Sequence, residues 1–492
     1  MRIFVYIIAL TFALASWSVP IHDPDLGWHL FGGSWIVAHG ELPSFDPINS
    51  LNLTWTDYHW LAQILFYKLY EAGGYELLRL FFGLLIGYLG ILIVDICYLT
   101  TRRKGHPYLI LIAFGIALTI ITVLTTIRPH AIALVLIALS YRRLLQQKTT
   151  WELPYLFLLA SLCVNIHVYW IMIPFLWFCY RAVPRLLRVN SKESVAYAWG
   201  GLIILSLSGL VSPYGIFNST GEIFANYLVI YDYLVMPASL REIIHELKGT
   251  FAVGGIVSIL SVVIIAILFR YTKYRHLQAK PGNLFSLFGL LILSIRSLKF
   301  ATLFGLVTAP QVARNLTHAK RKFFPNALIF RQGITQVVLI VVFAFGVFRA
   351  INLSPFVYDN TLFLDDNVPL NACRKIASLN LKSKSHKHLR VLTHFNDGGW
   401  CRWAAYLENP DLDLRVTADG RTQLVPGAEI YRLVELYNLH GHWATTLHNI
   451  APDVILAHKD LPLAQLLVRA QTEWRVIHED PKYAVFARQK SY

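Results

Sequence analysis

Two acidic residues stand two positions apart just after the first apolar stretch of the chain, in the segment Asp23-Pro24-Asp25-Leu26-Gly27-Trp28-His29. A partly desolvated carboxylate at a membrane surface is suited to act as a general base towards an acceptor hydroxyl. Two carboxylates with few other ligands also suit a divalent cation, Mg²⁺ or Mn²⁺. Asp23, Asp25 and His29 are therefore candidate catalytic residues, and Asp23 and Asp25 are candidate metal ligands. The plainer interpretation, a helix cap with a solvated neighbour, stays open.

Pro24 predicts the local structure of this segment. Proline disfavours helical backbone at the residue before it and is common in the first turn of a helix, so we expect Asp23 to be the N-cap. Asp25 and His29 would then share one helical face at a spacing of four residues.

Four further ionisable side chains lie between apolar runs at other places in the chain: Arg128, His167, Arg296 and Lys299. Ionisable groups near membrane depth are costly, so they usually face a cavity or a partner. Guanidinium and ammonium groups bind phosphate oxygens well, which makes these residues candidates for binding a lipid-carrier phosphate. In the alternative interpretation, each side chain extends to the lipid headgroups.

The composition indicates what must position these residues. The chain has 492 residues, of which 55% are hydrophobic and only 15% are charged. Soluble domains usually carry about 25% charged residues. The composition excludes a disordered chain, a coiled coil and an ordinary cytosolic enzyme, and it predicts a polytopic α-helical membrane protein.

About eleven apolar stretches approach the roughly 20 residues that a helix needs to span a bilayer. They are 3–19, 77–99, 108–127, 129–141, 153–165, 168–183, 195–211, 251–269, 284–296, 299–313 and 334–352. The first could also be a cleavable signal peptide. We favour an uncleaved anchor, because cleavage would release the acidic segment from its tether.

The positive charge of the chain follows these stretches in a regular way. The formal net charge is +15, most of it lies in residues 1–352, and each cluster of Lys and Arg follows an even-numbered stretch. By the positive-inside rule, the N-terminus and these loops are cytoplasmic. The loop 20–76 and residues 353–492 are then outside the membrane. Because the basic residues belong to the loops, we expect no nucleic-acid binding.

Residues 353–492 are nearly neutral and change in pattern, which indicates a soluble α/β domain on the outer face. Short strands are predicted at 391–394, 454–458, 475–478 and 484–487, and helices at 400–406, 429–436 and 463–469. Within the loop 20–76, residues 58–72 predict an amphipathic helix on the bilayer surface. Cys373 and Cys401 could form a disulfide in an oxidising compartment.

Several segments resemble those of a group of bacterial membrane proteins related to the GT-C glycosyltransferases. These segments are Asp23–Leu30, Gly33–Gly40, Trp60–Gln63, Ile127–His130, Asn165–His167, Arg296–Phe300, Phe395–Trp403 and Asp419–Arg421. The resemblance implies a GT-C-like fold of many helices, a catalytic first outer loop and donors in which a sugar is linked to polyprenyl phosphate. Asp23 and Asp25 match the positions where the group has its base or metal ligand. Gly27 stands where an aromatic residue is common in the group.

The sequence thus predicts a glycosyltransferase of the bacterial cytoplasmic (inner) membrane, which moves a sugar from a polyprenyl-phosphate carrier to an acceptor on the outer, periplasmic side. The lipid-linked sugar, the bilayer and an acceptor are the expected partners. The Trp-Trp-Asp motif of oligosaccharyltransferases is absent from the sequence, which argues against transfer to asparagine. A non-catalytic subunit of polysaccharide or glycoconjugate assembly and a transporter are the alternatives, because fold alone does not fix function.

Overall fold

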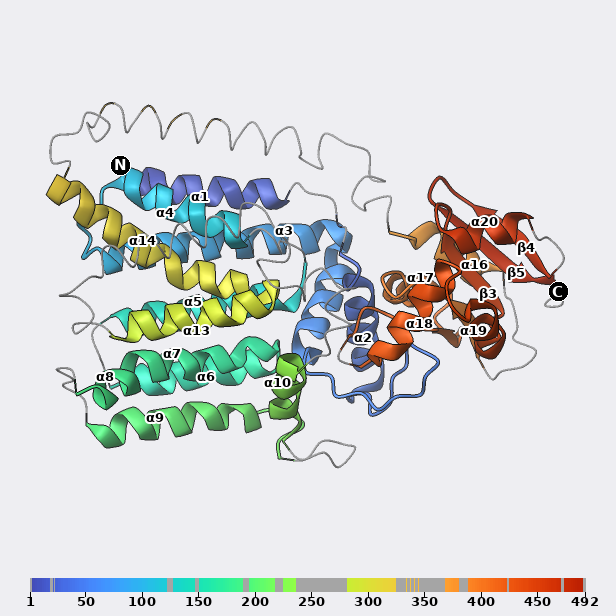
Figure 1. Cartoon of the computed structure of the whole chain (residues 1–492), viewed down its shortest axis with the longest axis horizontal. Helices are drawn as coiled ribbons and strands as arrows, with labels where there is room; N and C mark the ends of the chain where they lie inside the picture. The colour runs from blue at the N-terminus through green and yellow to red at the C-terminus, as the bar shows by residue number, and fades with distance from the viewer. Residues whose placement is uncertain are drawn as a thin grey trace.

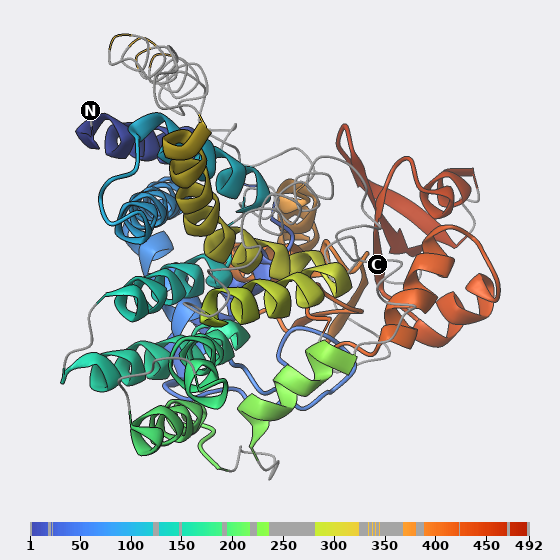
Figure 2. The same cartoon turned by 60° about the vertical axis from the view of Figure 1, so that its left-hand side comes forward.

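A layer of helices and an α/β domain make up the computed structural model, with α2 (Leu26–His39) and the first part of α3 (Trp60–Thr100) between them (Figure 1). The view turned by 60° shows the same arrangement (Figure 2). The structure describes residues 2–17, 21, 23–121, 127–146, 150–188, 194–216, 224–235, 281–323, 333, 337, 340, 344, 368–379, 388–422, 424–469 and 473–489.

The other elements of the helical layer run roughly parallel to one another in Figure 1. They are α1 (Arg2–Trp17), α4 (Pro107–Ile121), α5 (Pro129–Leu145), α6 (Glu152–Val164), η2 (Val168–Ile171), α7 (Met172–Trp177), η3 (Phe178–Ala182), α8 (Val183–Leu186), α9 (Val195–Leu207), η4 (Ser208–Leu210), α13 (Pro281–Arg296), η6 (Leu298–Phe300) and α14 (Ala301–Phe323). The short helix α10 (Ala225–Val235) lies at the end of the layer that faces α2.

Each predicted span that falls in the described part corresponds to a helix, although 168–183 is broken into η2, α7, η3 and α8. The predicted spans 251–269 and, apart from single residues, 334–352 lie outside the described residues, as does the predicted domain boundary at 352/353. Among the described helices, one, α3, is long and apolar enough to cross a membrane, and several others are apolar but shorter. The number of eleven spans therefore stays a prediction.

Polar contacts between helices gather at the two ends of the layer. Near the last turns of α3, Arg142 Nε donates to Asp95 Oδ2 at 2.5 Å. At the first residue of α3, Trp60 Nε1 donates to the side-chain oxygen of Asn165 at 2.9 Å. The basic loop after α5 therefore lies at the end remote from the α/β domain, and the predicted outer loop after α6 lies at the near end. Which end faces the cytoplasm stays a prediction.

Two glycines divide α3 into separate helices. Gly73 and Gly74 have non-helical backbone angles, and Gly74 has φ 64°, a left-handed value that glycine adopts without steric cost. Residues 60–72 are thus a helix distinct from the apolar run that begins after the kink. The sequence predicted this division, and the position of residues 60–72 on the bilayer surface stays a prediction.

The α/β domain contains one five-stranded sheet in the order β2-β1-β3-β5-β4. Strands β1 and β3 are parallel and adjacent, as are β1 and β2, whereas β5 is antiparallel to β3 and β4. The elements are α16 (Leu370–Ser378), β1 (Leu389–Leu392), α17 (Gly398–Glu408), β2 (Leu414–Val416), α18 (Gly427–Tyr437), α19 (Trp443–Ile450), β3 (Val454–His458), α20 (Pro462–Arg469), β4 (Trp474–Glu479) and β5 (Tyr483–Arg488). The four predicted strands and three predicted helices are all present. Strand β2, with three residues, is too short to show a period in the sequence.

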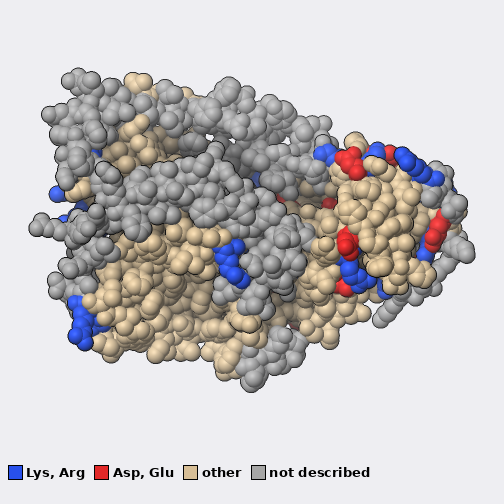
Figure 3. All heavy atoms as spheres, viewed as in Figure 1, with Lys and Arg blue, Asp and Glu red and all other residues tan. Residues whose placement is uncertain are grey.

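The outer loop and the α/β domain share one hydrophobic core. Leu26, Trp28 and Phe31 of α2 are buried in the same cluster as Trp400 and Trp403 of α17. In Figure 3 the described surface of the α/β domain carries both signs of charge, whereas that of the helical layer is largely uncharged between its ends. The uncharged band fits a bilayer, and the shared core fixes the outer loop against the soluble domain.

Candidate functional site

Helix α2 starts at Leu26, and Asp25 occupies its N-cap position without a side-chain capping bond. The expectation that Asp23 is the N-cap is therefore wrong by two residues. Instead, Asp23 Oδ1 accepts the backbone N–H of Asp25 at 2.7 Å, a local turn that short acidic side chains favour. The backbone N–H of His29 donates to Asp25 O at 3.2 Å, so the expected spacing of four residues is present in the helix.

Arg128 bridges the two carboxylates. Its Nε donates to Asp23 Oδ2 at 2.5 Å, and its Nη2 lies 3.3 Å from Asp25 Oδ2. Arg128 has extended backbone because Pro129 follows it and begins α5. The side chain of Asp23 is fully buried, while 18% of the Asp25 side chain and 13% of the Arg128 side chain are exposed. We call Asp23, Asp25 and Arg128 the open triad, since its Asp25 and Arg128 side chains reach solvent.

The α/β domain holds this segment in place. Trp400 Nε1 donates to the backbone oxygen of Asp23 at 2.8 Å. A Cβ atom at Gly27 would lie 2.5 Å from the backbone nitrogen of Trp400, so α17 approaches α2 too closely for any side chain there. This contact explains why Gly27 stands where the resemblance implied an aromatic residue. An aromatic side chain is supplied one position later, because Trp28 Nε1 donates to Asp25 Oδ1 at 3.1 Å.

A row of imidazole rings leads away from the open triad. The ring centroids of His29 and His59 are 5.3 Å apart, those of His59 and His167 are 5.4 Å apart, and those of His167 and His130 are 6.2 Å apart. All four side chains are buried. His167 Nδ1 accepts the backbone N–H of Tyr169 at 3.2 Å, which places the ring proton on Nε2.

Burial lowers the pKa of His29, His59 and His167, so these three rings are uncharged at neutral pH. Desolvation, with the nearby charge of Lys299, lowers the pKa of His59 to about 3. Desolvation and the neighbouring His59 also lower the pKa of His29 well below its usual value. Neutral imidazoles can donate or accept hydrogen bonds but add no positive charge for a phosphate.

The structure brings five of the seven predicted site residues into one connected region: the open triad, His29 and, through His59, His167. Lys299 in η6 lies beside this row, because its charge acts on His59 and His167 and its backbone oxygen accepts the Tyr169 hydroxyl at 2.6 Å. Arg296 differs from the others, since it is exposed at the C-terminal end of α13. Binding of the carrier phosphate by Arg296 stays a prediction.

The contacts of Asp23 and Asp25 do not fit a metal centre. Both oxygens of Asp23 are engaged, one by the backbone of Asp25 and one by Arg128. A divalent cation bound to the same carboxylates would lie close to the guanidinium, where two unit charges about 4 Å apart repel by about 4 kcal/mol and a double charge by about twice as much. Within the described ranges, no three His, Cys, Asp or Glu side chains form a group that could hold a metal ion.

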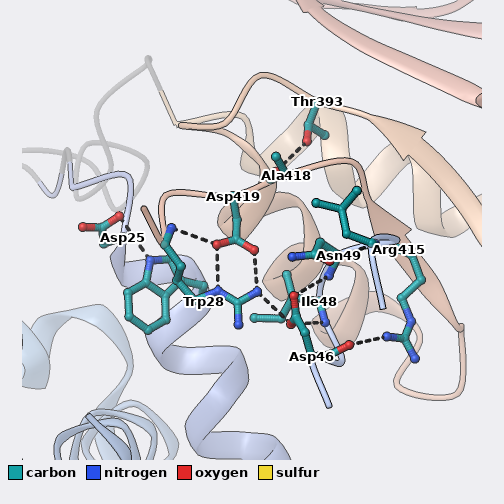
Figure 4. Close-up of polar contacts among 11 residues, drawn as sticks. Asp25, Trp28, Asp46, Ile48, Asn49, Thr393, Arg415, Ala418 and Asp419 are labelled. Carbon is teal, nitrogen blue, oxygen red and sulfur yellow. Dashed lines mark hydrogen bonds and ion pairs between the residues drawn. The ribbon is translucent and has the colours of Figure 1, made fainter. Parts of the chain in front are cut away.

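A second cluster of one arginine and two aspartates lies beside the first. Arg421 Nη2 lies 2.7 Å from Asp46 Oδ1 and 2.5 Å from Asp419 Oδ2, and all three side chains are fully buried. In Figure 4 Asp46 and Asp419 flank the guanidinium, with Trp28 and Asp25 next to them. We call Asp46, Asp419 and Arg421 the sealed triad, since none of its side chains reaches solvent.

Backbone pairing strengthens the junction at the sealed triad. The backbone N–H of Val416 in β2 donates to Ile48 O at 3.0 Å, and the N–H of Ser50 donates to Val416 O at 2.8 Å. Asn49 thereby forms a parallel bridge with Val416, so the outer loop extends the edge of the sheet. Residues 46–50 of the first outer loop are thus bound to the α/β domain by both backbone and charge.

Sequence reasoning gave no role to His59 of the imidazole row, nor to the residues that build this junction: Trp28, Asp46, Trp400 and Arg421. Their burial depends on the contact between the outer loop and the distant C-terminal domain, which no local pattern shows. Asp419–Arg421 was one of the segments that carry the resemblance, and this is the signal that could have led to the sealed triad. Cys373 and Cys401 are buried as free thiols whose side chains hydrogen bond to each other, so the disulfide considered from the sequence is absent.

Comparison with known proteins supports the architecture. No protein-family model matches the chain, and no curated protein sequence matches it. Two solved structures resemble it along nearly its whole length. The oligosaccharyltransferase AglB of Archaeoglobus fulgidus, in complex with an inhibitory peptide and a dolichol-phosphate, has a TM-score of 0.60 at 14% identity, covering 93% of this chain and 69% of that one. ArnT of Cupriavidus metallidurans, bound to undecaprenyl phosphate, has a TM-score of 0.51 at 13% identity, covering 99% of this chain and 97% of that one.

At such low identity the likeness concerns the fold and not the activity. The agreement covers both the helical layer and the α/β domain, since more than nine-tenths of the chain is aligned in each case. The chain therefore has the GT-C-like fold that its first outer loop led us to expect.

Proposed function

We propose that the chain is a membrane glycosyltransferase that moves a sugar from a polyprenyl-phosphate carrier to an acceptor on the outer side of the bacterial cytoplasmic membrane. The observation that carries this proposal is the open triad, in which a partly exposed carboxylate and a guanidinium lie 3.3 Å apart at one end of the helical layer. The two structural neighbours, which are in complex with dolichol-phosphate and undecaprenyl phosphate, support a lipid-phosphate substrate.

Asp25 is the proposed general base. Of the two aspartates, it is the one whose side chain reaches solvent, and it stands at the N-terminus of α2. The Trp28 indole and the Arg128 guanidinium each engage one of its oxygens, which fixes the direction of the carboxylate. A base held in this way can take the proton of an acceptor hydroxyl as that oxygen attacks the anomeric carbon of the sugar.

Arg128 and Lys299 are the proposed contacts for the carrier phosphate. When the bond between the sugar and the phosphate breaks, negative charge grows on the leaving phosphate, and fixed cations stabilise it. Arg128 has exposed surface beside Asp25, and Lys299 is half-buried beside the imidazole row. His29 and His167 would assist as neutral hydrogen-bonding groups. In this arrangement the N-terminus is cytoplasmic and the α/β domain lies outside.

Incubation of membranes that contain the protein with a panel of labelled polyprenyl-phosphate sugars tests the proposal. We expect one donor to lose its label to an acceptor and to leave free polyprenyl phosphate. The variant in which Asp23 and Asp25 both become Asn should be expressed and inactive, and the exposed Asp411→Asn variant, which carries the same chemical change, should be fully active. Full activity of the double variant would remove the open triad from the mechanism, and no transfer from any donor would favour the non-catalytic subunit.

A further inference from the structure

We propose that Arg128 is the built-in cation of this site and stands where a divalent metal ion would otherwise be bound, so that the protein needs no metal. The role of this cation in transfer rests on the proposed function, whereas its position does not. The acidic pair of residues 23 and 25 invites the expectation of Mg²⁺ or Mn²⁺, and three features of its contacts argue for a fixed arginine instead.

The first argument is geometric. One guanidinium reaches both carboxylates, with Nε at 2.5 Å from Asp23 Oδ2 and Nη2 at 3.3 Å from Asp25 Oδ2. Both carboxylates that would hold a metal ion here therefore already face one cation. The planar fork of arginine presents its N–H groups in a fixed geometry, which suits it to span two carboxylate oxygens.

The second argument is that neighbouring residues fix the positions of Asp23 and Arg128. Pro129 restrains the backbone of Arg128, and the Asp23 side chain that receives Nε is fully buried. The other oxygen of Asp23 bonds the backbone of Asp25, and Trp400 bonds the backbone oxygen of Asp23. To admit a metal ion at this position, the guanidinium would have to give up its contact with the buried Asp23 carboxylate while its own positive charge stayed beside the ion, which is costly.

The third argument is the balance of charge. Two carboxylates and one guanidinium leave one negative charge on the open triad, so the pair of carboxylates is already half neutralised without a metal ion. A metal ion would add two positive charges next to Arg128 and would compete with it for the same oxygens. The fixed arginine supplies a positive charge for the phosphate and orients the Asp25 carboxylate without a bound metal ion.

Binding of Mn²⁺ to the purified full-length protein, followed by electron paramagnetic resonance, tests the proposal without any transfer reaction. We expect the wild type to bind less than a tenth of an equivalent at about 0.1 mM Mn²⁺. The Arg128→Met variant removes the charge while keeping an unbranched side chain, and it should bind about one equivalent. The further change Asp25→Asn should abolish that binding again.

One equivalent of Mn²⁺ on the wild type, lost in Asp25→Asn, would overturn the proposal. A transfer assay distinguishes this failure from failure of the proposed function. If the wild type transfers sugar and chelation by EDTA lowers the rate less than twofold, both proposals hold. If chelation lowers the rate more than tenfold and Mn²⁺ restores it, the function holds and the built-in cation is wrong. If no donor reacts while Mn²⁺ still fails to bind, the proposal of a built-in cation holds and the proposed function is wrong.

Discussion

The open triad and the sealed triad contain the same groups, one arginine and two aspartates, and lie next to each other. In the sealed triad the side chains of Asp46, Asp419 and Arg421 are all fully buried. In the open triad only Asp23 is fully buried, and Asp25 and Arg128 keep exposed surface. Burial, rather than residue type, therefore separates a cluster that joins two parts of the chain from one that can meet a substrate.

Trp28 connects the two triads. Its Nε1 donates to Asp25 Oδ1 at 3.1 Å, and the guanidinium carbon of Arg421 lies 5.8 Å from its ring centroid. A second indole, Trp55, lies 4.4 Å from the same guanidinium. The sealed triad and these two rings thus form a wall beside residues 23–25, the proposed catalytic segment. Through this wall the α/β domain would help to position Asp25.

The largest expected effect is on the sealed triad. Arg421→Met leaves two buried carboxylates without their cation, and loss of one partner of a buried pair costs about 3–5 kcal/mol. Chemical denaturation should show this loss in the free energy of unfolding of the α/β domain. Arg128→Met is the matched control, with a smaller loss because water reaches the open triad. Equal losses would show that the difference in burial between the two triads does not affect the free energy of unfolding.

The second effect is on transfer. Arg128→Lys keeps a positive charge, but a single ammonium cannot reproduce the fork that spans two carboxylates. We expect kcat/KM to fall about 10- to 100-fold, which corresponds to about 1.4–2.7 kcal/mol. Arg432→Lys, at an exposed ion pair in α18, should leave the rate unchanged. A fully active Arg128→Lys variant would show that only the charge matters.

The third effect concerns pH and the α/β domain. Burial raises the pKa of Asp397 to about 7, from 3.8. As pH rises from about 4 to about 7, the unfolded chain releases this proton before the folded chain does, so the free energy of unfolding falls by up to about 1.4 kcal/mol per pH unit. Asp397→Asn should remove this part of the slope when denaturation is measured across that range. The control variant Asp411→Asn should keep the slope of the free energy of unfolding against pH. An unchanged slope in Asp397→Asn would show that another group binds the proton.

The smallest effect is at the wall between the triads. Trp28→Phe keeps an aromatic ring but removes the N–H that fixes Asp25, and a single hydrogen bond contributes about 0.5–1.5 kcal/mol. We expect transfer to slow by about 2- to 10-fold with little change in stability. Trp151→Phe, at an indole that is 75% exposed, is the control. A fall in transfer rate as large as that of an Asp25 variant would show that the indole takes a direct part in the chemistry.

Local patterns were sufficient for most of the fold. Apolar stretches located most helices of the helical layer, although not α10, the composition change located the α/β domain, and the Asp23 and Asp25 pair led to the open triad. Each of these signals depends on neighbouring residues in the sequence, so it is visible without a structure. Arg128 was expected to bind phosphate, and its bridging of the two aspartates was not foreseen.

The rest depends on contacts between distant segments. Asp46 and Arg421 are 375 positions apart, and although Asp419–Arg421 is one of the segments that carry the resemblance, nothing in the sequence pairs it with Asp46. The same holds for Gly27, whose lack of a side chain is explained only by the approach of Trp400. The helix start was misplaced by two residues because Asp23 uses its side chain for a turn and for Arg128, and proline propensity does not report such competition.

The central claim is that Asp25 of the open triad is the base for transfer from a polyprenyl-phosphate sugar. The most direct measurement is the rate at which purified protein releases polyprenyl phosphate from its donor, compared between the wild type and Asp25→Asn at equal thermal stability. We predict a fall of about 10²- to 10⁴-fold with the melting temperature unchanged, as for loss of a general base. Release by Asp25→Asn at the wild-type rate would contradict the claim.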